Sequence, residues 1–272
     1  MVHITTYTEP GSAQRPNEDW VGTTNNLITV LDGVSAYADL DGCHHGTPWF
    51  VANLGIRILT AASDPATTLP DALADAIRQT NALHEHTCRL TELGTPAAAV
   101  AIVRVGDQTT EWLGLADTTI ALVRHTGELT VHTDNRVDHI ATEQRDAALA
   151  TPLRSPEHPN AITRLQQEQR LYRNTRDGYW VAGTDSSAAY QAETGTLPTR
   201  DLAKVLVTTD GAARIVDVFQ QLDWQSAIDS ISLHGLPVLV RQTRELEAAD
   251  PDGVTWRRYK PADDATAALM TV

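Results

Sequence analysis

This chain of 272 residues has little that would tie it to a membrane or to an oxidising compartment. It contains only two cysteines, Cys43 and Cys88, which are too few for a disulfide scaffold. None of its apolar runs approaches the roughly 20 residues that a membrane-spanning helix needs. The first residues, Met1 to Ile4, are typical of a strand and lack the basic and apolar regions of a signal peptide. These absences predict a cytoplasmic protein with no membrane partner.

Basic residues are also scarce. The chain has 21 Lys and Arg against 35 Asp and Glu, which gives a net charge of −14. A surface this acidic repels nucleic acid and anionic lipid, so we expect neither as a partner. No linker rich in Pro, Gly or Ser interrupts the sequence, and 42% of its residues are hydrophobic. We therefore expect a single domain over residues 1–272.

The N-terminal third is expected to hold strands followed by two helices. The first 30 or so residues predict two or three strands, of which Leu27–Leu31 is the clearest. A helix is expected with Thr47 as its N-cap and Pro48 at its first position. A second helix is expected to begin near Thr68 and to end near Gly94.

The rest of the chain is predicted to be rich in strands, with helices near its end. A meander of strands is expected over 97–105, 111–115, 120–124 and 129–132. Residues 134–177 are polar, with one helix expected at about 161–171, and we interpret them as a surface flap or insert. Further strands are expected at 178–181, 205–209 and 265–272, with two or three helices between 212 and 249. This order favours an α+β fold of antiparallel sheets with helices packed outside them over alternating βαβ units.

Four aspartates, Asp19, Asp32, Asp210 and Asp263, each follow or open an apolar, strand-like run. Carboxylates, a carbonyl such as that of Gly33, and water are the ligands of Mg²⁺ or Mn²⁺ rather than of zinc or copper. Two such ions about 3.5–4 Å apart can clamp a phosphoryl group and activate a water molecule. The pattern thus predicts hydrolysis of a phosphate ester without a covalent enzyme intermediate. The alternative is a set of ordinary turn and capping aspartates, because Asp-Gly is a common turn pair.

Six short segments, taken in order, resemble the motifs of the type 2C metal-dependent serine/threonine protein phosphatases. They are Arg15-Pro16-Asn17-Glu18-Asp19, Val30-Leu31-Asp32-Gly33, Gly94-Thr95-Pro96-Ala97, Gly114-Leu115-Ala116-Asp117-Thr118-Thr119, Leu206-Val207-Thr208-Thr209-Asp210-Gly211 and Asp263-Asp264-Ala265-Thr266. Each motif is short, but together they span residues from about 3 to 272. The resemblance implies an α-β-β-α sandwich, in which two central antiparallel sheets are flanked by helices.

The resemblance also implies a centre of two Mn²⁺ or Mg²⁺ ions, with a third ion as a further alternative. Asp32 would bridge the two ions and Gly33 would lend its carbonyl. Asp117 falls where bacterial members place a ligand of a looser third metal, although a plain turn residue fits its position equally well. The full set of implied metal ligands is Glu18, Asp19, Asp32, Gly33, Asp117, Asp210 and Asp263. Asp210 and Asp263 would complete the coordination of one ion, and Glu18 and Asp19 would hold the other.

Arg15 would be a catalytic phosphate clamp alongside Asp32, since its planar fork suits a phosphate group. Pairing with surface carboxylates is the alternative. One residue, not the usual two, separates Arg15 from Asn17, which shifts its register. Val34 stands where members of the family usually have His or Met, so His44, His45 or a metal-bound water would have to act as the general acid. The chain is therefore expected to be a divergent bacterial-type member.

Two other departures from the family pattern also indicate a divergent member. Thr118-Thr119 replaces the Ser-Arg of the family, and Arg214 falls about where some members carry an acidic residue. The implied function is hydrolysis of phosphoserine and phosphothreonine monoesters on protein substrates. Two alternatives stay open: a catalytically impaired binding or regulatory module, and a hydrolase acting on a small phosphorylated metabolite.

Two clusters of residues fall outside these motifs. Arg164, Arg170, Arg173 and Arg176 lie in the expected flap and could face a phosphorylated partner or simply form a solvated helix face. The residues Cys43, His44 and His45 precede the first helix, and His84, His86 and Cys88 end the second. A helical hairpin would bring these ends together as a mixed Cys/His zinc site, as a disulfide or, most ordinarily, as packed thiols beside surface histidines.

Overall fold

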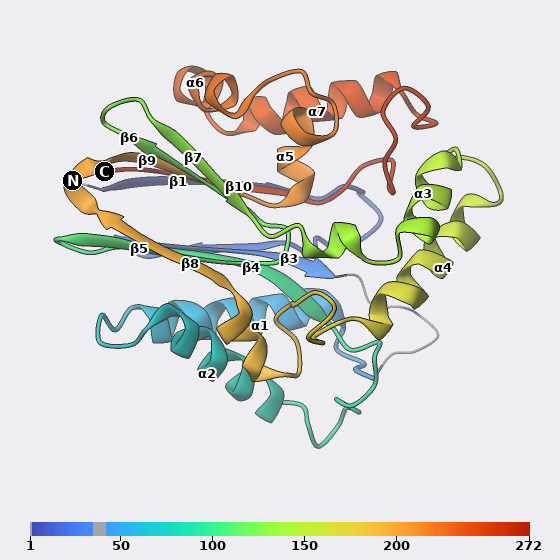
Figure 1. The fold of residues 1–272 in the computed structure, drawn as a ribbon, viewed down its shortest axis with the longest axis horizontal. Coiled ribbons are helices and arrows are strands. Elements are labelled where there is room, and N and C mark those ends of the chain that lie inside the picture. Colours follow the sequence, from blue (N-terminus) through green and yellow to red (C-terminus); the bar gives the residue numbers. More distant parts are fainter. Residues whose placement is uncertain (1, 35–41) are drawn as a thin grey trace.

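Two five-stranded antiparallel sheets stack face to face, with helices covering both outer sides (Figure 1). The computed structural model describes residues 2–34 and 42–272 of the chain. This arrangement confirms the expected α+β sandwich of two central sheets flanked by helices.

The two sheets contain strands from both halves of the chain. In the first sheet the order is β1-β10-β9-β6-β7, with β1 at His3–Glu9, β10 at Ala265–Thr271, β9 at Leu202–Thr208, β6 at Thr119–Arg124 and β7 at Leu129–Thr133. In the second the order is β2-β3-β4-β5-β8, with β2 at Trp20–Thr23, β3 at Leu27–Val34, β4 at Ala97–Val105, β5 at Thr109–Leu115 and β8 at Glu193–Pro198.

The helices fall into three groups (Figure 1). The second sheet is covered by α1, Gly46–Ala62, and α2, Leu69–Ala82. The first sheet is covered by α5, Asp210–Asp217, α6, Trp224–His234, and α7, Pro237–Ala249. At one end of the sandwich lie α3, Thr142–Ala150, and α4, His158–Leu171. Short 3-10 turns occur at Arg136–His139, Ser186–Gln191 and Thr199–Asp201.

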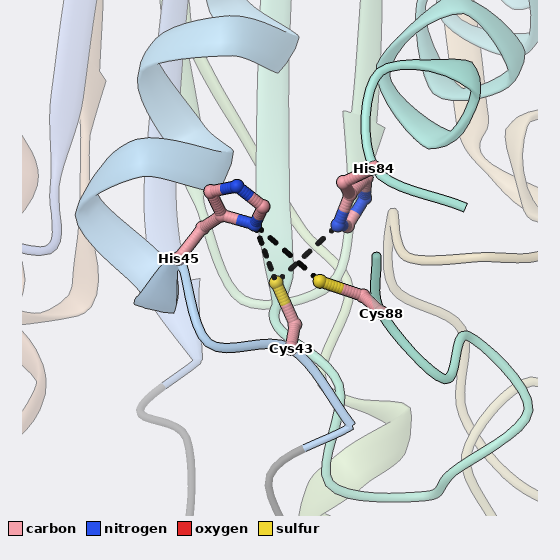
Figure 2. Close-up of side chains that lie close together, drawn as sticks. All are labelled: Cys43, His45, His84 and Cys88. Atoms are coloured by element: carbon pink, nitrogen blue, oxygen red, sulfur yellow. Dashed lines mark hydrogen bonds between the residues drawn. The ribbon is translucent and has the colours of Figure 1, made fainter. Parts of the chain in front are cut away.

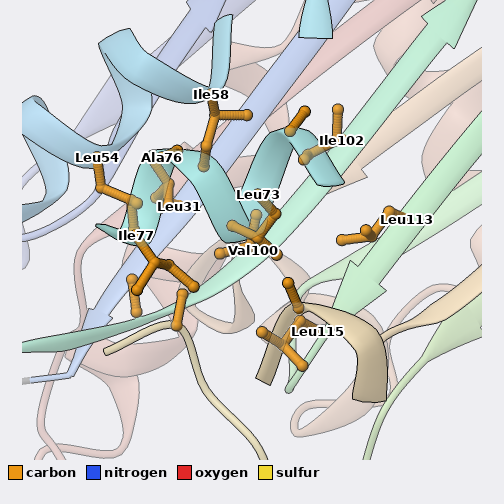
Figure 3. Close-up of a cluster of buried hydrophobic side chains, with 14 of the residues drawn as sticks. Leu31, Leu54, Ile58, Leu73, Ala76, Ile77, Val100, Ile102, Leu113 and Leu115 are labelled. Carbon is orange, nitrogen blue, oxygen red and sulfur yellow. The ribbon is translucent and has the colours of Figure 1, made fainter. Parts of the chain in front are cut away.

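Alternation along the strands sorts their side chains into separate apolar layers. On β3, Ile28 and Val30 pack between the sheets, whereas Leu27 and Leu31 face the helices. Figure 3 shows the helix-facing layer, where side chains of α1 and α2 such as Leu54 meet strand residues. Each fully buried Leu or Ile contributes about 1.5–3 kcal/mol, so these layers hold the strand ends in place.

Both predicted helices of the N-terminal third are present, with different ends. The first begins at Gly46 rather than after Thr47, whose hydroxyl donates instead to the carbonyl of Val34 at 3.2 Å. The second begins as predicted, because the Thr68 side chain accepts from the backbone N–H of Asp71. It ends at Ala82 and not near Gly94, since the chain then turns repeatedly.

The predicted meander is wrong, because β5 and β6 belong to different sheets. The chain crosses between the sheets through Ala116, whose φ of 63° lies in the left-handed region. The strand expected at 178–181 is also absent; the chain there makes only isolated bridges. One strand and one α-helix were not predicted: β8, which is a polar edge strand, and α3, which buries only Ala148.

The segment 134–177 contains a 3-10 turn, α3 and α4, where one helix was predicted. Among the described residues, no helix combines the length and apolar character needed to cross a bilayer. The residues Ser35 and Ala36, which follow Val34, lie outside the described part.

Candidate functional site

Five aspartates from separate parts of the chain converge beside α4, at one end of the two sheets. Four of them, Asp32, Asp117, Asp210 and Asp263, line one cleft of about 230 Å³. The fifth, Asp19, is buried. Its charge helps to raise the pKa of Asp32, and the charges of Asp210 and Asp263 help to raise the pKa of Asp19 itself. The cleft therefore gathers carboxylates that the sequence distributes over most of its length.

The position of Asp32 follows from strand alternation. Ile28 and Val30 point between the sheets, so the next residue of the same parity, Asp32, does so at the strand end. The adjacent Gly33 must be a glycine, because a Cβ there would collide with the carbonyl oxygen of Glu18 and with the Thr47 side chain. The first turn of α1 and the segment before β2 thus pack directly against this part of β3.

The carboxylate of Asp210 is placed by the junction of β9 and α5. Asp210 is the first residue of α5, where the helix dipole favours a negative charge. The hydroxyl of the preceding Thr209 donates to Asp19 at 2.9 Å, which joins two of the converging segments. A Cβ on Gly211 would collide with the carbonyl oxygen of Asp264, so the chain packs too closely here for any other residue.

The carboxylate of Asp117 lies on the link between the sheets, and the residue that follows β7 holds that link in place. The backbone N–H of Ala116 donates to the Asp134 carboxylate at 3.2 Å, and the Arg136 guanidinium binds the same carboxylate at 2.8 and 2.5 Å. Burial raises the pKa of Asp134, but the hydrogen bonds from Arg136 outweigh burial and leave that pKa lowered. Asp134 was not predicted, since nothing near it in the sequence marks its contact with Ala116.

Burial and crowding of the carboxylates raise the pKa values of four aspartates at the cleft. Burial, together with the charge of Asp210, raises the pKa of Asp117 to about 7. Burial also raises the pKa of Asp32 well above its usual range, and Asp19 and Asp210 add to the effect. The pKa values of Asp19 and Asp210 are raised as well, first by burial. A hard divalent cation would relieve this repulsion, so the donor set fits Mg²⁺ or Mn²⁺.

The environment of Asp263 is different, because two cations of the chain hold its oxygens. The Lys260 ammonium lies 2.7 Å from one oxygen, and the Arg214 guanidinium lies 2.9 Å from the other. Burial raises the pKa of Asp263, yet Lys260 and Arg214 outweigh it and leave the pKa lowered. Arg214 also pairs with Glu247 at 2.7 Å. Lys260 was missed in the sequence, although its place three residues before Asp263 is a usable signal.

The segment that carries Arg15 and Glu18 lies next to the cleft. The Asp264 carboxylate accepts from the backbone N–H groups of Gly11 and Glu18, both at 2.7 Å. Arg15 and Glu18 line a second cavity of about 220 Å³, and Lys260 and Asp263 line both cavities. The exposed Arg15 is thus at the rim and does not line the main cleft.

Among the four arginines of the expected flap, Arg170 and Arg173 line the cleft. Arg173 donates to the carbonyls of Leu93 and Thr95 at 3.4 and 3.2 Å. Arg164 and Arg176 are exposed and do not line it. The two histidines proposed as a general acid, His44 and His45, lie against Cys88 and likewise do not line the cleft.

The family model of Protein phosphatase 2C matches residues 12–241 of the chain. The chain belongs to the protein phosphatase 2C family. This confirms the resemblance drawn from the six motifs.

Several solved structures share the fold of this chain. The serine/threonine phosphatase Stp1 from Staphylococcus aureus is 12% identical, with a TM-score of 0.60 over 100% of this chain and 95% of that one. The catalytic domain of PstP in complex with two manganese ions is 13% identical, with a TM-score of 0.59 over 99% and 97%. PppA from Pseudomonas aeruginosa is 16% identical, with a TM-score of 0.54 over 99% and 97%. No curated protein matches the chain.

Proposed function

We propose that this protein is a metal-dependent phosphatase that hydrolyses phosphoserine and phosphothreonine monoesters on protein substrates. The observation that carries the proposal is the cleft of about 230 Å³ lined by aspartates of separate segments, Asp32, Asp117, Asp210 and Asp263. Membership of the protein phosphatase 2C family supports phosphate esters as substrates. The fold shared with bacterial serine/threonine phosphatases supports a phosphoprotein among them.

The chain offers oxygen ligands for two Mn²⁺ or Mg²⁺ ions. Asp32 and the Gly33 carbonyl would help to hold these ions, together with Asp210 and Asp263 for one ion and the buried Asp19 and its neighbour Glu18 for the other. Asp117 would hold a third. When bound, such ions supply Lewis acidity toward a phosphoryl oxygen and lower the pKa of water.

Cations of the chain itself would position the substrate. A protein with a net charge of −14 repels a phosphate dianion at a distance, so local positive charge is needed at the cleft. Arg170 and Arg173 line the cleft beside the aspartates and would bind the phosphoryl oxygens. Arg15, at the rim, would contact the polypeptide or phosphate outside the cleft.

The test is turnover of p-nitrophenyl phosphate and then of phosphoserine peptides with added Mn²⁺. We expect hydrolysis that EDTA abolishes and that Asp32→Asn lowers at least about 100-fold, a loss of roughly 2.7 kcal/mol in transition-state stabilisation. Asp107→Asn, on an exposed turn, should leave the rate unchanged. A folded protein without Mn²⁺-dependent hydrolysis would contradict the proposal. Faster turnover of phosphorylated metabolites than of phosphopeptides would instead indicate that the substrate is a small phosphorylated metabolite.

A catalytically impaired binding module is the second candidate, and one observation favours it. Both oxygens of Asp263 are already held by Lys260 and Arg214, so this carboxylate is partly neutralised without a metal. Titration calorimetry with Mn²⁺ distinguishes the enzyme from the binding module. Two Mn²⁺ ions bound with micromolar or tighter affinity support the enzyme, whereas one weak ion and no turnover support the binding module.

A further inference from the structure

A second cluster of ligand-type side chains lies away from the acidic cleft, where the start of α1 meets the turns that follow α2. Cys43, His45, His84 and Cys88 each point one sulfur or nitrogen atom toward a common centre (Figure 2). These four atoms lie within 4.8 Å of one another. Both cysteines are free, so no disulfide joins them in this structure.

The distances match the edges of a tetrahedral zinc site. Nδ1 of His84 lies 3.3 Å from the Cys43 sulfur, and Nδ1 of His45 lies 3.6 Å from that sulfur and 3.4 Å from the Cys88 sulfur. With Zn–S near 2.3 Å and Zn–N near 2.05 Å, tetrahedral geometry places sulfur and nitrogen ligands about 3.6 Å apart. The three sulfur–nitrogen distances are therefore close to the spacing that zinc imposes, and all four atoms lie near a common point.

Pairwise hydrogen bonds account for this arrangement less well than a central cation does. Nδ1 of His45 faces both sulfurs at once, although this nitrogen has only one lone pair or one N–H for a hydrogen bond. Nε2 of His84 is buried and has no hydrogen-bond partner among the described residues, so the polar contacts of this ring lie at the centre of the cluster.

The surroundings also suit a structural metal rather than a catalytic one. Cys43 is 1% exposed and His84 is 2% exposed. The Trp49 ring stacks on His45 with centroids 4.3 Å apart and lies 5.0 Å from the His84 ring. These rings shield the centre, and four protein ligands leave no open position for a substrate.

We propose that Cys43, His45, His84 and Cys88 bind one structural Zn²⁺ ion. Binding releases the two thiol protons to solvent, and two thiolates with two neutral imidazoles leave the site with no net charge. Thiolate and imidazole are the ligands of zinc, so this site and the carboxylate cleft select different metals.

The ion would fasten the entry of α1 to the turns after α2. Cys43 and His45 immediately precede α1, and the backbone N–H of Arg89 already donates to the carbonyl of Gly42 at 2.6 Å. The first turn of α1 in turn carries Thr47, which contacts Gly33 at the acidic cleft. Zinc at this position would thus stabilise the helix that supports one wall of the cleft.

The experiment measures zinc per chain by mass spectrometry of the metal after gel filtration of reduced protein. We expect one zinc in the wild-type protein and less than about a tenth of that in Cys88→Ser, whose partly exposed side chain makes it the milder substitution. His86→Ala is the matched control, because His86 lies in the same turns with its side chain 87% exposed and outside the cluster. It should retain one zinc.

Three measurements keep the proposal falsifiable if a variant fails to fold. An organomercurial should release one zinc per wild-type chain, because it attacks thiolates and leaves carboxylate sites alone. Cobalt-substituted wild-type protein should show tetrahedral d–d bands and a thiolate charge-transfer band, and removal of zinc should lower the Tm by about 5 °C or more. Reduced wild-type protein that holds no zinc, a Cys43–Cys88 disulfide in freshly isolated protein, or zinc retained by folded Cys88→Ser would each overturn the proposal.

Discussion

Asp263 and Asp264 are neighbours in the chain but perform different tasks. Asp264 accepts two backbone hydrogen bonds, from Gly11 and Glu18, and so ties the N-terminal segment to the start of β10. Asp263 faces the cleft and is held by Lys260 and Arg214. A metal that uses Asp263 must therefore compete with the chain's own cations for the same oxygens.

Lys260 provides the sharpest test at the scale of single residues. Its ammonium is a like charge at the edge of the proposed cation site, so Lys260→Met should tighten Mn²⁺ binding about tenfold, or roughly 1.4 kcal/mol. Titration calorimetry with Mn²⁺ measures the change. Lys204→Met is the matched control, because Lys204 is the other lysine of the chain and donates to Ser232 on α6. If Lys260→Met weakened Mn²⁺ binding instead, the lysine would be a partner of the metal site and not its competitor.

At the scale of elements, the link between β5 and β6 decides where Asp117 lies. Ala116 adopts a left-handed conformation that is unfavourable for a residue with a Cβ, and Asp134 of the segment after β7 holds it there. Asp134→Ala would leave Arg136 and the Ala116 N–H without this acceptor. We expect a loss of about 2–3 kcal/mol in the free energy of unfolding, measured by urea denaturation.

Asp107→Ala, in the exposed turn between β4 and β5, should change that free energy by less than about 0.5 kcal/mol. An Asp134→Ala variant as stable as this control would show that the left-handed link needs no brace.

The ion-pair network around Arg214 joins α5, α7 and the entry to β10. Arg214 binds Glu247 and Asp263, and Arg244 also pairs with Glu247 at 2.8 Å. Because both Arg214 and Glu247 are buried, Arg214→Met should cost about 3–5 kcal/mol by removing one of the two cations that each of these carboxylates binds. Chemical denaturation monitored by circular dichroism measures this loss. The exposed Arg241→Met on α7 is the control, and equal stability of the two variants would contradict the expectation.

The same elements show what the sequence could and could not predict. Asp32-Gly33 and Asp210-Gly211 were found because a strand end followed by glycine is a local signal. The meander failed because pairing between strands is not local: β5 and β6 are close in the chain yet belong to different sheets. Asp134 was missed for a similar reason, since its partner Ala116 lies eighteen positions earlier.

At the scale of the whole molecule, the candidate metal centre draws on both sheets. Asp32 lies near the end of a strand of one sheet, Asp210 and Asp263 flank strands of the other, and Asp117 lies on the link between them. A cation bound by this set would hold the two layers together at one end. Metal binding should therefore stabilise the fold as a whole and not a single loop.

Stability should then depend on pH in opposite ways with and without metal. The pKa of Asp117 is raised to about 7 in the folded chain against an ordinary value of 3.8, and that of Asp32 is raised as well. Below pH 3.8 both states hold the proton; between 3.8 and 7 only the folded state does, so the metal-free protein loses stability as pH rises toward 7. A divalent cation binds the deprotonated carboxylates, so its stabilising effect grows over the same range.

We expect the Tm in EDTA to be about 3–6 °C lower at pH 8 than at pH 6, and the increase in Tm caused by Mn²⁺ to be larger at pH 8. In Asp117→Asn the drop in EDTA should shrink, because the substituted side chain no longer titrates. A metal-free Tm that rises from pH 6 to pH 8 would mean that the carboxylates of the cleft are already stabilised as anions by Lys260 and Arg214. In that case the cations of the chain, rather than a bound metal, would neutralise the centre, which is the condition under which the binding-module alternative holds.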